Sequence, residues 1–181
     1  MIKIVYDCER YHDVLRSVAQ PEDLAIEIGP HVGGSTKALA SACAKVISVD
    51  KAEQAEAASG RFPDNVSFVR GDVRFFSTVA EVLKLTKSCD VFAIDMGGGR
   101  FPDTVFKVWA VWSGVFKPRD AVIRCRGLAE FIKRAEIDDP KIDSLFGGLK
   151  DSGWLSQCGR ATPIQLKDGL EELKNWMPSK T

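Results

Sequence analysis

One stretch, residues 24–36 (LAIEIGPHVGGST), constrains the fold of this chain more than any other part of the sequence. A run of apolar and small residues passes through Glu27 into Gly29, and Gly33-Gly34-Ser35-Thr36 then opens a helical pattern. The stretch therefore predicts a buried strand, a glycine turn and the start of a helix. Glycine has no Cβ and tolerates positive φ, so such a turn lets backbone amides and a helix N-terminus approach a ligand closely.

An acidic residue follows this turn at an informative distance. Asp50 ends the next apolar run, KVISVD, and lies 21 residues after Gly29. An acid at the tip of the second strand, about 20 residues beyond the glycine turn, is the usual position for binding the two hydroxyl groups of a ribose. Together the two features predict that the chain binds an adenosine-containing cofactor.

Strand-like and helix-like patterns alternate along most of the chain. After a short leader and a helix within residues 2–19, strands are expected at 24–28, 45–49, 66–70, 90–95 and 121–125, and helices at 34–44, 52–59, 74–87, 103–116 and 128–135. This alternation predicts a parallel sheet with helices on both faces. The strands VFAI and AVIRC are mainly continuous apolar runs, as expected where both faces of a sheet are covered.

The C-terminal part differs from this pattern. Two strand-like segments, GWLSQC and TPIQLK, are separated only by Gly159-Arg160-Ala161, which is too short for a parallel crossover. We therefore expect an α/β fold: a doubly wound, mostly parallel seven-stranded sheet with helices on both faces and a C-terminal antiparallel hairpin. The 181 residues should form a single domain, with a leader helix in 1–20, a core in 22–166 and a C-terminal extension in 167–181.

The charge balance argues against bulk attraction to nucleic acid or membranes, because twenty-five basic residues match twenty-five acidic ones. No apolar run approaches the ~20 residues that span a bilayer, and the first residues are charged where a signal peptide needs an apolar core. We therefore expect a cytoplasmic protein. Its five cysteines are scattered and lack a CxxC pair, which favours reduced thiols over a disulfide framework or a zinc site.

The segment from Glu27 to Thr36 looks like the E/D-x-G-x-x-x-G-x-S/T first motif of the class I S-adenosylmethionine-dependent methyltransferases. Gly71-Asp72-Val73, directly after the strand at 66–70, looks like the third motif of the same family. The resemblance covers roughly residues 22–166, and the family's seven-stranded sheet is parallel apart from its last strand. It implies a methyltransferase whose cofactor is S-adenosylmethionine.

By this resemblance, residues at the strand ends would contact the cofactor. Glu27 would reach the methionine ammonium through water, and Asp50 would take both ribose hydroxyls. Asp72 would accept from the adenine amino group while the Val73 amide meets the ring, and Asp95 would line the sulfonium and substrate side. With the glycine loop facing the amino-acid half, the implied set is Glu27, Gly29, His31, Gly33, Ser35, Asp50, Asp72, Val73 and Asp95.

The chemistry of the cofactor supports these roles independently. It carries an ammonium and a cationic sulfonium but no pyrophosphate. Carboxylates at Glu27, Asp72 and Asp95 therefore suit this cationic ligand better than they would suit a dianionic one. A helix N-terminus near Gly34 suits its carboxylate. A strand-end acid can also serve as an ordinary helix N-cap, and this alternative stays open for each acid taken singly.

The reacting end shows no familiar catalytic signature. Asp95 is followed by Met96-Gly97-Gly98-Gly99-Arg100, without an N/D-P-P-Y tetrad. Gly97 and Gly98 would either let a substrate lie against bare backbone or form a flexible turn before the next helix, and Arg100 would either pair with an anionic acceptor or be a solvated charge. Asp95 and His31 are the candidate catalytic residues, although a base is needed only if the acceptor must lose a proton.

No residue identifies the methyl acceptor. We expect a small molecule or a protein rather than nucleic acid, because acidic residues dilute the basic ones around the fifth strand. Arg124-Cys125-Arg126 stands where metal-dependent O-methyltransferases carry an Asp-Asn pair, so no metal is expected. A core of this size leaves few residues for an acceptor pocket, so we also consider a homodimer.

Two other functions stay open at this point. An NAD-binding oxidoreductase could use the same strand order, although it would favour glycine where this chain has His31. A non-catalytic module that keeps a nucleoside-cofactor pocket would also lack a catalytic tetrad.

Overall fold

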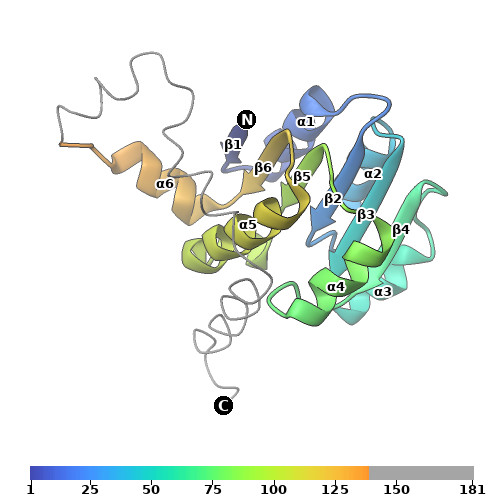
Figure 1. Cartoon of the computed structure of the whole chain (residues 1–181). Helices are drawn as coiled ribbons and strands as arrows, with labels where there is room; N and C mark the ends of the chain where they lie inside the picture. The colour runs from blue at the N-terminus through green and yellow to red at the C-terminus, as the bar shows by residue number, and fades with distance from the viewer. Residues whose placement is uncertain (139–181) are drawn as a thin grey trace.

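The structure, a computed structural model, describes residues 1–138. Its centre is a sheet in the order β1-β6-β5-β2-β3-β4, in which every pairing is parallel and helices lie on both faces (Figure 1). The strands are β1 (Ile2–Val5), β2 (Leu24–Ile28), β3 (Lys45–Asp50), β4 (Val66–Arg70), β5 (Val91–Ile94) and β6 (Asp120–Arg124). The helices are α1 (Cys8–Val18), α2 (Gly34–Ala40), α3 (Glu53–Ser59), α4 (Phe76–Leu85), α5 (Pro102–Phe116) and α6 (Arg126–Arg134), with a 3-10 turn η1 (Gly97–Gly99) after β5. The α/β class and the parallel sheet are confirmed.

The central strands carry apolar side chains on both sides, which is why helices cover both faces. On one face, Ile26 belongs to a cluster with residues of α4 and α5, including the fully buried Trp112. On the other face, Ala25 packs with α1 and α2, and Tyr11 of α1 is fully buried there. Side chains alternate along a strand, so Glu27 shares this second face with Ala25.

The strand β1 was not expected from the sequence. Residues 2–5 were predicted to be a leader before a helix, whereas β1 runs parallel to β6, with Ile2 opposite Ala121 and Val5 opposite Arg124. The pattern IKIV is only four residues long, so its signal is weak without the neighbouring strand. The predicted strand count is wrong for residues 1–138, where five of the seven expected strands were placed and the structure has six, all parallel. The predicted antiparallel hairpin and the extension at 167–181 lie outside the described residues.

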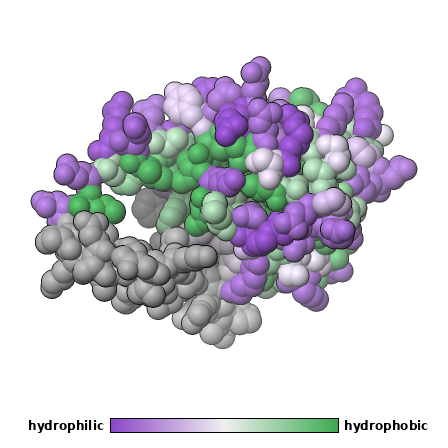
Figure 2. Space-filling model, turned by 90° about the horizontal axis from the view of Figure 1, so that it is seen from above, coloured by the Kyte–Doolittle hydropathy of each residue, from purple (hydrophilic) through white to green (hydrophobic). Residues whose placement is uncertain are grey.

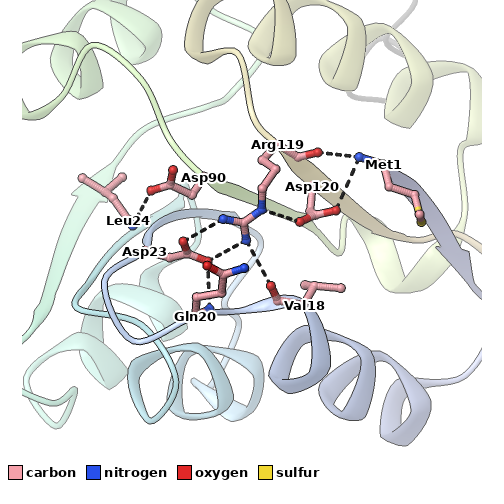
Figure 3. A network of polar contacts seen from close by, with 8 residues as sticks. All are labelled: Met1, Val18, Gln20, Asp23, Leu24, Asp90, Arg119 and Asp120. Carbon is pink, nitrogen blue, oxygen red and sulfur yellow. Dashed lines mark hydrogen bonds and ion pairs between the residues drawn. The ribbon is translucent and has the colours of Figure 1, made fainter. Parts of the chain in front are cut away.

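A network of charged side chains holds the amino ends of the strands together (Figure 3). Both terminal nitrogens of Arg119, just before β6, donate to the carboxylate of Asp23, just before β2, at 2.9 and 2.8 Å. Arg119 also donates to Asp120 at 2.8 Å and to the carbonyl of Val18 at 3.1 Å. Asp90 accepts from the amide of the first residue of β2 at 2.9 Å. The network joins the α1–β2 connection to the starts of β5 and β6.

Among residues 1–138, no helix is long and apolar enough to cross a membrane. Seen from above, the molecule shows an area of hydrophobic residues with hydrophilic ones around it (Figure 2). The exposed apolar side chains include Ile2 of β1 and Phe131 and Ile132 of α6. Part of the hydrophobic surface therefore lies at the β1 edge of the sheet.

Candidate functional site

The register of the sheet brings three predicted site residues together at its carboxyl edge. Ile28, the last residue of β2, lies opposite the penultimate residue of β3 and the last residue of β5. The next positions on these strands, Gly29, Asp50 and Asp95, are therefore neighbours. The Gly29 amide donates to the β3 backbone at 3.0 Å, and the Asp95 amide donates to the Ile28 carbonyl at 2.9 Å.

The turn after β2 is shaped by contacts within the protein. Gly29 has a φ of 81°, and a Cβ there would lie 2.1 Å from the backbone carbonyl oxygen of Asp95. Gly33 has a φ of 91°, and its Cβ would lie 2.6 Å from the ring of Phe62. His31 between them is exposed and has a φ of 51°, the left-handed conformation that glycine adopts most readily. Contact with the Asp95 backbone therefore requires glycine at position 29, and the positive φ favours glycine at position 33 as well.

Glu27 is a fully buried carboxylate two residues before Gly29. Its Oε2 accepts hydrogen bonds from the hydroxyl groups of Thr36 at 2.7 Å and Ser48 at 2.5 Å, whereas Oε1 has no partner among the described residues. Burial raises the pKa of Glu27, and hydrogen bonds from nearby hydroxyl groups, including that of Ser35, act against the rise. A buried oxygen without a donor is costly, so a ligand donor that reached Oε1 would be stabilising.

Asp50 and Asp72 lie at the ends of neighbouring strands but differ in their partners. Asp50 accepts from the Ala52 amide at 3.0 Å through Oδ1, and its Oδ2 accepts from none of the described residues. Asp72 is engaged at both oxygens by Arg74, and Lys51 lies 3.3 Å from Oδ2. Burial by itself would raise the pKa of Asp72, but the hydrogen bonds from Arg74 hold that pKa below its ordinary value. Asp50 can therefore accept from a ligand directly, whereas Asp72 must first exchange one of its present bonds.

Asp95 is joined by residues that the sequence analysis did not assign to the site. Arg124, at the end of β6, donates to Asp95 Oδ1 at 2.5 Å, and both side chains are mostly buried. The Nε of Arg124 and the hydroxyl of Tyr11 are buried without partners among the described residues. Burial raises the pKa of Tyr11, and the carboxylates of Glu27 and Asp95 raise it further, so these groups lie within electrostatic reach of one another. The sequence signal for Arg124 was a charge inside an apolar strand, and Tyr11 occupied an ordinary apolar helix position.

The remaining predicted cofactor residues, Ser35 and Val73, are both buried. Ser35 lies in the first turn of α2 and is 6% exposed. Val73 is also buried: its carbonyl accepts from the indole of Trp112 at 2.9 Å, and its amide donates to none of the described residues. A Cβ at Gly34 would lie 3.2 Å from the ring of His12, so α1 packs against the start of α2.

The triple glycine forms a left-handed loop after β5. Gly97, Gly98 and Gly99 all have positive φ, and a Cβ at Gly98 would meet open space. Arg100 is exposed, and its Nε lies 3.3 Å from the Gly97 carbonyl oxygen. The thiol of Cys125 contacts the Gly99 carbonyl at 3.5 Å and so anchors the loop to the end of β6. The predicted substrate-side residues are therefore accessible at the carboxyl edge.

The described residues fit the cofactor that the sequence implies. Among the described residues, Glu27 Oε1 and Asp50 Oδ2 have no hydrogen-bond donor, so both can accept from cationic or hydroxyl groups of a ligand beside the Gly29 turn. Within residues 1–138, no group of three or more His, Cys, Asp or Glu side chains could hold a metal ion.

Neither a family model nor a curated protein sequence matches this chain. Solved structures do match it. An rRNA methylase from Streptococcus thermophilus has a TM-score of 0.50 at 18% identity, over 70% of this chain and 78% of that chain. A precorrin 8W decarboxylase from Methanobacterium thermoautotrophicum has a TM-score of 0.49 at 18% identity, over 78% of this chain and 70% of that chain. Aeropyrum pernix fibrillarin with natively bound S-adenosylmethionine has a TM-score of 0.47 at 16% identity, over 60% of this chain and 48% of that chain.

At these identities the likeness concerns the fold. The chain has the class I, Rossmann-like fold of the S-adenosylmethionine-dependent methyltransferases, as the sequence motifs implied.

Proposed function

We propose that this protein is an S-adenosylmethionine-dependent methyltransferase. The observation that carries the proposal is the arrangement around the Gly29 turn, where Glu27 and Asp50 each keep a carboxylate oxygen that no described residue occupies. These oxygens match two donors of one molecule, the ammonium and the ribose diol. No observation on residues 1–138 favours the alternative of an NAD-binding oxidoreductase.

In this proposal the residues of the chain bind and orient the cofactor. Glu27 holds the methionine ammonium through water, and Asp50 holds the ribose hydroxyls. Asp72 accepts from the adenine amino group after it exchanges a bond to Arg74 or Lys51, next to the Val73 amide. The turn that contains His31 and the nearby Ser35 forms the wall at the amino-acid half.

When bound, the cofactor supplies a methyl group that is attached to a positively charged sulfur. Transfer of this methyl group leaves the rest of the cofactor as a neutral thioether. The protein contributes mainly by positioning, which can remove about 7–11 kcal/mol of a barrier. Asp95, fixed by Arg124, faces the transfer side, and Asp95 or His31 serves as the base if the acceptor must lose a proton.

The acceptor in this proposal binds at the Gly97, Gly98 and Arg100 side of the site. Its identity is open, and we place the reaction in the cytoplasm, in a monomer or a homodimer.

Thermal unfolding with S-adenosylhomocysteine, S-adenosylmethionine and NAD in parallel tests the proposal. A ligand that binds only the folded state adds about 2.7 kcal/mol of apparent stability at 100 times its dissociation constant. We expect the two sulfur compounds to raise the Tm and NAD to leave it unchanged. Stabilisation by NAD alone would contradict the proposal. Incubation of cell extract with the protein and an isotope-labelled methyl donor would then identify the acceptor by mass spectrometry, and binding without transfer would favour a non-catalytic module.

A further inference from the structure

Tyr6 and Arg126 form an exposed stacked pair at the carboxyl edge. Tyr6 directly follows β1 and is 49% exposed, and Arg126 begins α6 just after β6. Because β1 and β6 are neighbours, the guanidinium carbon of Arg126 lies 5.3 Å from the centroid of the Tyr6 ring. A cation at the first residue of a helix opposes the helix dipole, so helix stability does not explain this arginine.

Phe101 is a second exposed aromatic residue at this edge. Its side chain is 59% exposed, and its backbone is left-handed, with φ 60° and ψ 61°. A Cβ at Gly97 would lie 2.9 Å from the ring, so the ring lies over the glycine loop. A bulky residue in this conformation is strained, and such strain concentrates at binding and catalytic sites. Burial of the ring does not offset the strain, because most of it faces solvent.

The two aromatic residues belong to one continuous surface. A Cβ at Gly99 would lie 3.2 Å from the Arg126 amide nitrogen, and a Cβ at Gly127 would lie 3.1 Å from the ring of Pro102. The loop that carries Phe101 therefore packs directly on the start of α6. We call the four exposed residues of this surface the aromatic rim: Tyr6, Arg100, Phe101 and Arg126.

The charges of the rim favour an anionic ligand group. Asp7 lies beside Tyr6, but it caps α1 by accepting from two backbone amides at 2.8 and 3.0 Å. Asp103 lies in the first turn of α5, where an acid is stabilised by the helix dipole. The guanidinium groups of Arg100 and Arg126 have no carboxylate partner among the described residues.

We propose that the aromatic rim is the acceptor subsite and that it takes a nucleotide. The base stacks on Tyr6 and Phe101, since every base offers a π-face, and the phosphate pairs with the guanidinium groups. This inference rests on the proposed methyltransferase function, in which Asp95 faces the transfer side. It departs from the sequence-based preference against nucleic acid, because the sequence did not place Tyr6 beside Arg126.

Fluorescence anisotropy with a labelled ten-nucleotide single-stranded RNA tests the proposal on the full chain saturated with S-adenosylhomocysteine. We expect Phe101→Gly and Tyr6→Ala each to weaken binding about tenfold, the scale of losing one stacking ring. Arg126→Gln should weaken binding and reduce its dependence on salt. Competition by adenosine or uridine monophosphate would support a free nucleotide as the acceptor, and binding of the RNA alone would support a nucleotide within a strand.

Matched variants separate the rim from general effects. Glycine adopts a φ of 60° without strain, so Phe101→Gly should fold at least as well as the wild type. Phe131→Ala and Arg134→Gln remove exposed residues of α6 outside the rim and should leave RNA binding unchanged. The rim proposal is overturned if neither RNA nor mononucleotide binds, or if these control variants lose as much affinity as the rim variants. Failure to bind S-adenosylhomocysteine in calorimetry would instead remove the proposed methyltransferase function.

Discussion

The two edges of the sheet differ in whether their buried polar groups have hydrogen-bond partners. At the amino edge, Asp23 is almost fully buried, and both of its oxygens are held by Arg119. At the carboxyl edge, Glu27 Oε1, the hydroxyl of Tyr11 and the Nε of Arg124 are buried without partners among the described residues. The same chain thus satisfies its charges at one edge and leaves polar atoms unsatisfied at the other.

Backbone conformation shows the same contrast. Apart from Lys117, which ends α5, the residues with positive φ in the described part of the chain lie in the loops that follow β2 and β5 at the carboxyl edge. They are His31, Phe101, Gly29, Gly33, Gly97, Gly98 and Gly99. A positive φ is strained at His31 and Phe101 but not at the glycines. Such strain and unpaired buried polar groups both cost free energy, and a ligand can offset that cost. The comparison is consistent with an amino edge that holds the sheet together and with the proposal that ligand binds at the carboxyl edge.

The largest effect is expected for Gly29→Ala. A Cβ at this position would lie 2.1 Å from the Asp95 carbonyl, and the residue must also keep a φ of 81°. We expect a loss of about 3–5 kcal/mol in unfolding free energy, because strain and overlap with backbone add, together with loss of S-adenosylhomocysteine binding. The control is Gly98→Ala, which is also left-handed but faces open space, and it should lose only about 1–2 kcal/mol. Equal losses in urea unfolding would show that packing on β5 does not restrict the turn.

The next effect concerns the amino edge. Arg119→Met removes the cationic partner of the buried Asp23 and leaves it only the hydrogen bond from the Gln20 amide, so we expect a loss of about 2–3 kcal/mol in stability and no change in cofactor affinity. Arg16→Met breaks an exposed pair with Asp13 and should cost at most about 0.5 kcal/mol.

The loss in Arg119→Met should depend on pH in a defined direction. Arg119 lowers the pKa of Asp23 in the folded state. The stabilisation from the Arg119–Asp23 pair is therefore complete above the ordinary carboxyl pKa, and it is lost as the pH falls through the lowered pKa of the folded state. Urea titrations from pH 7 to pH 3 should therefore show the difference between wild type and Arg119→Met shrinking at the acidic end. A change in cofactor affinity in this variant would mean that the two edges are not independent.

The parts of the molecule that the sequence predicted well are those with local signals. The bounds of β2, β3 and β4 agree with the predicted segments to within one residue, because each strand is a compact run between clear breaks. β1 was missed because four residues carry little signal, and the strand depends on pairing with β6 more than a hundred residues away.

The site followed the same rule. Spacing linked Asp50 to the Gly29 turn, and the family resemblance placed Asp95 at the end of a strand on the same edge, because parallel strands end at one edge. The partner of Asp95 was not predicted, since Arg124 lies 29 residues further along the chain on the neighbouring strand. The pairing of Asp72 with Arg74 is local and was nevertheless overlooked, because the resemblance assigned that carboxylate to the cofactor.

Asp50 provides a smaller test of the carboxyl edge. Asp50→Ala should weaken S-adenosylhomocysteine binding by about 2 kcal/mol, the scale of a lost charge-assisted hydrogen bond. Asp50→Asn keeps an acceptor for the Ala52 amide, so it separates loss of the ligand contact from loss of the local cap. Asp64→Ala removes an exposed acid before β4 and should bind as the wild type does. An unchanged dissociation constant in Asp50→Ala, measured by calorimetry, would rule out the ribose contact.

Glu27→Gln should produce the smallest change in stability and the clearest pH signature. Burial raises the pKa of Glu27, so its favourable contribution is present below the unfolded pKa and is lost as the pH rises through the folded one. Glutamine keeps an acceptor for Thr36 and Ser48 but does not titrate.

The wild type should therefore lose stability relative to Glu27→Gln as the pH rises from acidic to neutral values. Cofactor affinity should fall about tenfold in the variant, because the charge that meets the ammonium is gone. Glu22→Gln, at an exposed position, should show neither effect. If the wild type instead gained stability relative to Glu27→Gln as the pH rose, Glu27 would be a compensated structural anion, and the contrast between the two edges would not hold at this residue.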